Sequence, residues 1–153
     1  MIFTTGTIHE EDLVLAFGAL DPATLAMVLK DGRPTSYLLH AHLLSRYSNL
    51  RRAPEKTMLG DGVVDTDGRA FQLRVITNRG MCLLPSKNLG VGRQYSPQDY
   101  REALQRVFGF ILIDVTKMPH IRYGAVEKEI IPFQIKFSYQ DALALLKISE
   151  NLT

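Results

Sequence analysis

The sequence predicts an α+β fold, a single domain in which helices precede and follow a small mixed β-sheet. Three segments carry this prediction. Over residues 35–47, apolar side chains recur at steps of three and four, which is typical of a helix. Residues 60–77 form two β-rich arms around an Asp-Gly turn. Residues 109–115 are a nearly continuous apolar run, typical of a strand that is buried on both faces. The length suits one domain, and neither a repeat nor a low-complexity linker divides the chain.

The remaining elements are predicted from helix caps, turn residues and short apolar runs. The segment Ser96-Pro97-Gln98-Asp99 begins with a hydroxyl cap and has proline at the first helical position, and Ser138 opens a similar cap. In chain order, the other expected elements are two short helices over 9–30, a strand over 81–84, a helix over 96–107, a turn and strand over 118–123, a short helix over 125–130 and a last helix over 138–150. Residues 1–50 therefore make up a helical N-terminal part.

The composition is that of an ordinary globular protein, with 46% hydrophobic and 22% charged residues. The net charge of +2 permits an anionic partner but does not require one. A single cysteine, Cys82, excludes an internal disulfide and a cysteine-rich metal site, which fits a reducing compartment. No apolar run approaches the roughly 18 residues of a membrane span, and the first residues lack the features of a signal peptide. We therefore expect a cytoplasmic protein that does not enter a membrane.

The histidines do not form a metal-binding pattern. His40 and His42 are two positions apart, so on a helix they point about 200° apart and cannot hold one metal ion together. His120 or His9 as the base of an unrelated α+β enzyme is the weakest of the functional alternatives, because lone histidines are rarely catalytic.

Polar side chains converge in the predicted hairpin. In a strand from residue 70 to 77, Gln72 and Arg74 point to one side and the apolar residues between them to the other. Asp65 lies seven positions before Gln72 across the turn, so we expect the hairpin to set it beside the Gln72-Arg74 face. Asp61 lies further out on the same arm. A carboxylate, an amide and a cation are thus expected on one patch.

With these residues the sequence resembles the PD-(D/E)XK nucleases, and in particular the small homodimeric type II restriction endonucleases. The resemblance covers residues 58–123. Asp61 or Asp65 matches the family's aspartate, Gly68 its turn glycine, Gln72 its glutamate and Arg74 its lysine. It implies a restriction-endonuclease-like core, a homodimer, DNA as the partner and Mg²⁺ as the cofactor.

The resemblance also implies a role for each residue. Asp65 and Asp61 would bind Mg²⁺, Gln72 would complete the metal shell, and Arg74 would stabilise the charge that develops on the scissile phosphate. Exposed cations would contact the flanking phosphates, and the candidates are Arg51, Arg52, Lys87 and Arg93.

Two departures from the family pattern leave two functions open. Gln72 is neutral where the family has a carboxylate, and Arg74 stays protonated where the family has a lysine that can accept a proton. One function is a Mg²⁺-dependent endodeoxyribonuclease. The other is a catalytically inactive nucleic-acid-binding or interaction subunit with the same fold.

Overall fold

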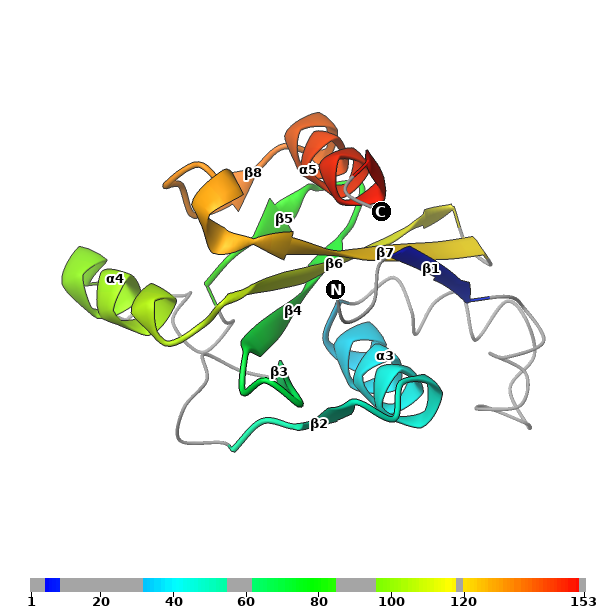
Figure 1. Cartoon of the computed structure of the whole chain (residues 1–153). Coiled ribbons are helices and arrows are strands. Elements are labelled where there is room, and N and C mark those ends of the chain that lie inside the picture. Colours follow the sequence, from blue (N-terminus) through cyan, green and yellow to red (C-terminus); the bar gives the residue numbers. More distant parts are fainter. Residues whose placement is uncertain (1–4, 9–31, 55–61, 85–95, 118–119, 152–153) are drawn as a thin grey trace.

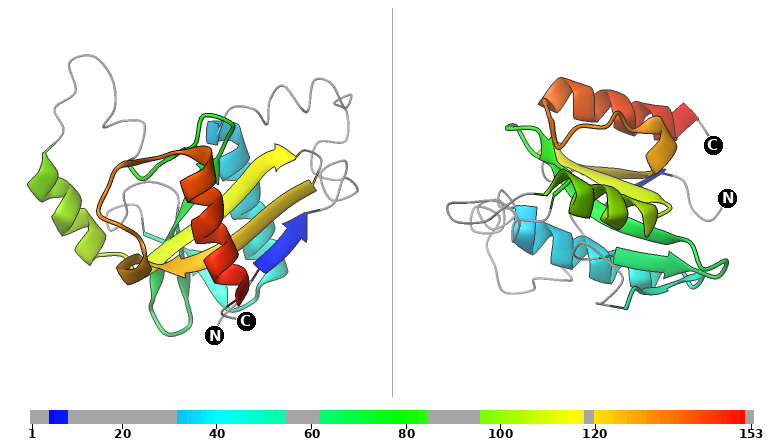
Figure 2. Two further views of the ribbon diagram at one scale, coloured as in Figure 1. Left: turned by 90° about the horizontal axis from the view of Figure 1, so that it is seen from above. Right: turned by 90° about the vertical axis from the view of Figure 1, so that its left-hand side faces the viewer.

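The computed structural model describes residues 5–8, 32–54, 62–84, 96–117 and 120–151. Within them, a six-stranded sheet carries α3 on one face and α5 on the other (Figures 1 and 2). The strands of this sheet are β1 (Thr5–Ile8), β2 (Leu50–Arg52), β3 (Gly62–Asp65), β4 (Ala70–Ile76), β6 (Gly109–Lys117) and β7 (His120–Glu127). The other elements are α3 (Gly32–Arg46), α4 (Pro97–Gln105), α5 (Tyr139–Asn151), the 3₁₀ helix η3 (Lys128–Ile130) and a two-stranded sheet of β5 (Met81–Cys82) and β8 (Lys136–Phe137).

The large sheet has the strand order β1-β7-β6-β4-β3-β2. Strands β4 and β6 pair in parallel, and the other neighbours pair antiparallel, so the sheet is mixed and the fold is α+β. The segment that returns the chain from β4 to β6 contains α4. Strand β6 pairs on both sides and its first seven residues are buried, as the continuous apolar run predicts.

The sheet separates two hydrophobic cores because successive side chains of a strand point to opposite faces. Along β6, Ile111 and Ile113 pack into the core beneath α3, whereas Phe110 and Leu112 pack into the core beneath α5. On β4, Leu73 belongs to the α3 core. This alternation fixes which polar residues of the hairpin can meet.

Most of the locally encoded elements are confirmed. The helix expected over 35–47 is α3, and the cap expected at Ser138 is present, because its Oγ accepts a hydrogen bond from the Asp141 N–H at 3.1 Å. The short helix expected over 125–130 is confirmed only over Lys128–Ile130, which form η3, because residues 125–127 continue β7. Ala125 and Val126 pair with β6 and pack against the two cores, so strand pairing outweighs the helical tendency of Ala125.

The N-terminal part is not purely helical, because β1 pairs with β7 at an edge of the sheet. Its residues, Thr5–Ile8, carry no strand pattern long enough to predict it. The helices expected over 9–30 lie outside the described residues. Among the helices that the structure does describe, none is both long and apolar enough to cross a membrane.

Candidate functional site

The β3–β4 hairpin is present, but its register differs from the expected one. Gly62 lies opposite Gln72, and Val64 lies opposite Ala70. Asp65 is at the end of the hairpin, where its N–H donates to the carbonyl oxygen of Arg69 at 3.0 Å. The prediction that Asp65 lies beside Gln72 is therefore wrong.

Asp65 and the Gln72-Arg74 pair also lie on opposite faces of the sheet. Directly opposed residues of an antiparallel pair share a face, and the faces alternate along each strand. Asp65 therefore points to the same face of the sheet as Val63, which packs into the core beneath α3. Gln72 and Arg74 alternate with Phe71 and Leu73 of that core, so they point to the α5 side. The structure thus brings Gln72 and Arg74 together but separates both from Asp65.

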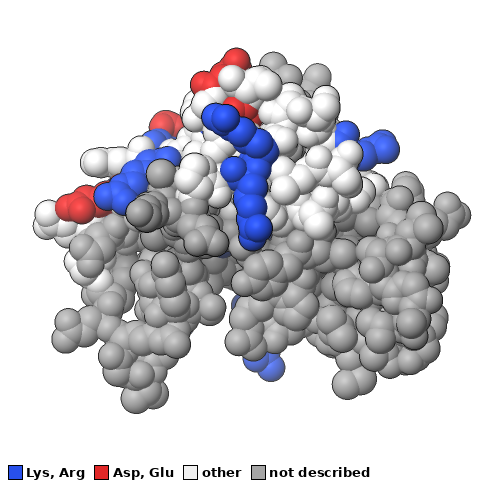
Figure 3. Space-filling view, turned by 90° about the horizontal axis from the view of Figure 1, so that it is seen from below, with Lys and Arg blue, Asp and Glu red and all other residues white. Residues whose placement is uncertain are grey.

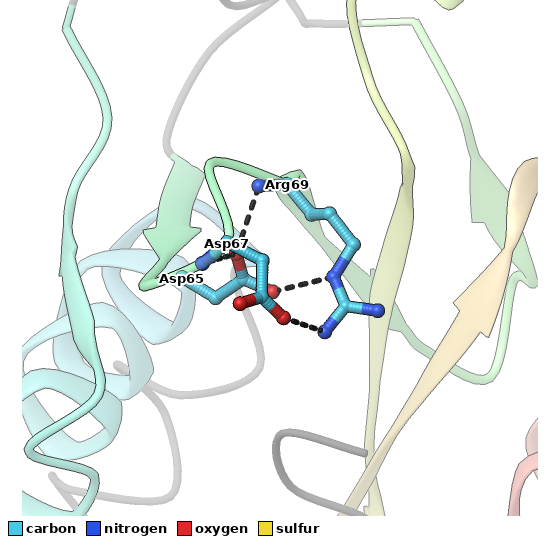
Figure 4. Close-up of polar contacts among 3 residues, drawn as sticks. All are labelled: Asp65, Asp67 and Arg69. Atoms are coloured by element: carbon cyan, nitrogen blue, oxygen red, sulfur yellow. Dashed lines mark hydrogen bonds and ion pairs between the residues drawn. The ribbon is translucent and has the colours of Figure 1, made fainter.

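The Asp65 carboxylate closes the hairpin turn (Figure 4). Its Oδ1 accepts the backbone N–H groups of Asp67 at 2.9 Å and Arg69 at 2.8 Å, and its Oδ2 accepts Arg69 Nε at 2.8 Å. Asp65 is fully buried. The Arg69 guanidinium also donates to the Asp67 carboxylate, and its central carbon lies 5.2 Å from the ring centre of Phe108. Both oxygens of Asp65 are therefore used in holding the turn.

Gln72 and Arg74 form a buried pair on the other face. Arg74 donates from Nε to the Leu83 carbonyl oxygen at 2.8 Å, from one terminal nitrogen to the Leu73 carbonyl oxygen at 2.7 Å, and from the other to Gln72 Oε1. Its guanidinium carbon lies 5.9 Å from the ring centre of Phe110. Arg74 thereby ties β4 to the segment after β5. The amide nitrogen of Gln72, Nε2, is buried and has no hydrogen-bond partner among the described residues.

These side chains do not fit Mg²⁺, which prefers carboxylate and other hard oxygen ligands. The orientation of the Gln72 amide is fixed by Arg74, because the flipped amide would point N–H groups at a cation that only donates. Both carboxylate oxygens of Asp65 and the Oε1 of Gln72 each already accept at least one hydrogen bond. The part of the chain that the structure describes contains no cluster of three or more His, Cys, Asp or Glu that could hold a metal. Asp61, Lys87 and Arg93 lie outside the described residues.

Three exposed arginines lie on or next to β2, the outermost strand at one end of the sheet. Arg46 is the last residue of α3, and a tight turn closed by the Leu50 N–H and the Tyr47 carbonyl oxygen at 3.0 Å leads to Arg51 and Arg52. We call Arg46, Arg51 and Arg52 the basic edge. All three are exposed, and none forms an ion pair with a described carboxylate. Seen from the side on which β2 lies, Lys and Arg form a stripe across the described surface (Figure 3).

A second polar cluster lies at the carboxyl ends of β4 and β6, and the sequence analysis did not identify it. Asp114 is buried and accepts Thr116 N at 3.0 Å, Thr116 Oγ1 at 2.6 Å and Arg122 at 2.9 Å. Burial raises the pKa of Asp114, but the bonds from Thr116 and Arg122 outweigh it and hold the pKa below its usual 3.8. The Thr116 hydroxyl donates to Asp114, so in its 3.1 Å contact with Tyr139 the tyrosine is the donor.

This cluster links β6, β7 and α5, and its carboxylate is fully paired. The signal that could have revealed it is one acid within the apolar run from Gly109 to Val115. A buried acid needs partners, but Arg122 and Tyr139 are 8 and 25 positions away and are not marked by any local pattern.

Comparisons with protein-family models, with curated proteins and with solved structures give no match. The function of the chain is therefore inferred from its own residues. The described structure offers exposed arginines on one edge of the sheet, a carboxylate that closes a turn, and a buried glutamine-arginine pair.

Proposed function

We propose that the chain is a DNA-binding protein that holds the phosphate backbone on its basic edge and does not cleave DNA at the hairpin. The observation that carries this proposal is that Arg46, Arg51 and Arg52, on or next to the outermost strand β2, are each exposed without an acidic partner among the described residues. Guanidinium groups match phosphate geometry, and unpaired surface cations release counterions when they neutralise phosphates.

The order of elements supports a restriction-endonuclease-like fold for this protein. The resemblance implies a hairpin, then a helix, then a buried strand. The described chain has the β3–β4 hairpin, then α4, then β6, and β6 lies beside β4 in the middle of the sheet.

The hairpin chemistry supports binding without cleavage. Metal-dependent hydrolysis needs oxygens that hold the ion and a group that takes a proton from the attacking water. Asp65 and Gln72 lie on opposite faces of the sheet and their oxygens already accept hydrogen bonds, and Arg74 cannot accept a proton at neutral pH. These residues therefore contribute structure, and the affinity comes from the basic edge.

A Mg²⁺-dependent endodeoxyribonuclease is the second candidate, and one observation favours it. The Nε2 atom of Gln72 is a buried donor without a described partner; such atoms are rare in native structures, and a catalytic role is one of the explanations for them. Asp61, which adjoins Gly62 in the sequence, is the remaining acid of the resemblance. In this candidate Asp61 replaces Asp65 as the metal ligand.

The binding proposal is tested by fluorescence anisotropy with a labelled DNA duplex over a range of salt concentrations. We expect Arg51→Gln/Arg52→Gln to weaken binding about tenfold and to reduce the log–log salt slope by about 2, because two phosphate contacts are lost. Arg79→Gln is the matched control, because Arg79 is exposed in the turn beyond the opposite end of β4. Unchanged affinity in the double variant, or the absence of salt-dependent binding by the wild type, overturns the proposal.

The absence of cleavage is tested with supercoiled plasmid and Mg²⁺ or Mn²⁺, with and without chelator. We expect no nicking by the wild type. Metal-dependent nicking that is lost in Asp61→Ala and kept in Asp65→Asn would establish the second candidate instead. Circular dichroism of each variant separates loss of activity from loss of folding.

A further inference from the structure

Phe133 lies on the segment between β7 and β8 and is held there by backbone contacts on both sides. The segment starts with the Lys128 N–H donating to the Phe108 carbonyl oxygen at 3.1 Å. It ends with the Ile135 carbonyl oxygen accepting the Leu83 N–H at 2.8 Å. Between these two hydrogen bonds, the Gln134 N–H donates to the Pro132 carbonyl oxygen at 2.7 Å. These hydrogen bonds hold the backbone in place on both sides of Phe133.

The Phe133 side chain is exposed although it is large and apolar. It is 58% exposed, more than Ile130 and Ile148, the other exposed large hydrophobics among the described residues, at 37% each. The guanidinium carbon of Arg101 lies 5.2 Å from the Phe133 ring centre, and the buried Tyr100 ring lies 5.7 Å away. Helix α4 therefore supplies both a neighbouring ring that anchors Phe133 and a cation over its ring face.

An exposed ring with an arginine beside its face suits an unpaired nucleic-acid base. Every base has a π-face that can stack on an aromatic side chain or a guanidinium plane, and an arginine can also contact phosphates of the strand. A duplex keeps its bases stacked inside, so it cannot use such a platform. Exposed Glu129 and Lys136 flank Phe133 in the sequence, and their opposite charges offset each other. The Phe133 ring and Arg101 therefore dominate the contact with an unpaired base.

We propose that Phe133 and Arg101 form a stacking site for an unpaired base of single-stranded DNA. This inference rests on the proposed DNA binding and adds a second contact, separate from the basic edge. It predicts that the stacking contact favours single-stranded over duplex DNA, while the phosphate contacts of both forms keep their dependence on salt.

The test compares labelled dT12 with a duplex of the same length, using the full chain. We expect Phe133→Ala to weaken dT12 binding about tenfold, the effect of losing one stacked base, while duplex affinity stays unchanged. Ile148→Ala, which also truncates an exposed apolar side chain, is the matched control and should change neither affinity. Arg101→Gln should weaken dT12 binding as well. The chain has no tryptophan, so the fluorescence of the Phe133→Trp protein reports this position alone and should be quenched by dT12.

The outcomes separate this inference from the proposed function. If Arg51→Gln/Arg52→Gln weakens duplex binding but Phe133→Ala leaves dT12 binding unchanged, the stacking site is wrong and the basic edge stands. If the wild type binds neither probe, both proposals are wrong. If Phe133→Ala changes self-association in sedimentation experiments and not dT12 affinity, the ring belongs to a protein interface and the stacking site is overturned.

Discussion

At the scale of single residues, Asp65 shows how an acid can match a catalytic pattern while its carboxylate stabilises a turn. Its carboxylate satisfies two backbone N–H groups and one arginine, all within four residues along the chain. Such local bonds form wherever an aspartate opens a tight turn, whether or not the turn is near a reaction centre. The position of an acid in a motif therefore does not by itself predict the direction of its side chain.

We expect Asp65 variants to lose stability in proportion to the hydrogen bonds that they remove. Asp65→Asn keeps the Oδ1 acceptor and loses the bond to Arg69 Nε, which should cost about 1 kcal/mol because the Arg69 side chain is 32% exposed. Asp65→Ala should cost about 2–3 kcal/mol, because two backbone donors also lose their acceptor. Urea unfolding measures both, and equal stability of wild type and Asp65→Ala would contradict the turn role.

At the scale of elements, the length of the hairpin loop decides which polar residues meet. Three residues, Thr66–Gly68, separate the hydrogen-bonded Asp65 and Arg69, and Gly68 has a positive φ of 80°. This is a three-residue loop with glycine in the left-handed region, one of the common hairpin loops. A two-residue loop would have shifted the register by one and put Asp65 on the face of Gln72.

The sequence predicts elements well where the signal is local. The apolar run of β6, the periodicity of α3 and the serine cap of α5 each lie within one segment, and the structure contains all three. The site depends on register and on partners distant in sequence, as with Gln72 opposite Gly62 and Asp114 beside Arg122. Those relations come from loop length and packing, which no single segment encodes.

Two glycines with positive φ give a matched prediction about turns. Gly68 has φ of 80° with open space around a built Cβ, so Gly68→Ala should cost about 1 kcal/mol from backbone strain alone. Gly80 has φ of 94°, and a Cβ there would overlap the carbonyl oxygen of Phe137 in β8. Gly80→Ala should therefore cost about 3 kcal/mol or more. Thermal and urea unfolding test the order, and equal losses would argue against the packing of this turn on β8.

At the scale of the whole molecule, the Asp114 cluster ties the middle of the sheet to the helix that covers it. Asp114 and Thr116 belong to β6, Arg122 to β7 and Tyr139 to the first turn of α5. Residues of β6 pack into the cores on both faces of the sheet, so the Asp114 cluster lies where the layers of the fold meet.

The lowered pKa of Asp114 predicts how acid affects stability. Its folded pKa lies below the unfolded value of 3.8, so its contribution is present above that pH and is lost as pH falls through the folded pKa. At pH 7 we expect Asp114→Asn to be less stable than wild type by about 1–2 kcal/mol, since the Arg122 side chain is 34% exposed. Urea unfolding at pH 7 and pH 3 should show this gap narrowing in acid. A stability difference between wild type and Asp114→Asn that widens in acid would contradict the lowered pKa of Asp114.

The basic edge has a further consequence, for how the protein behaves at high concentration. Strand β2 is the last strand of its sheet, and an outermost strand invites other chains to add strands and aggregate. A strand of only three residues with two exposed arginines resists such addition by brevity and charge repulsion. Replacing Arg51 and Arg52 with apolar residues would therefore be expected to cause precipitation, so glutamine is the better choice for measuring DNA binding.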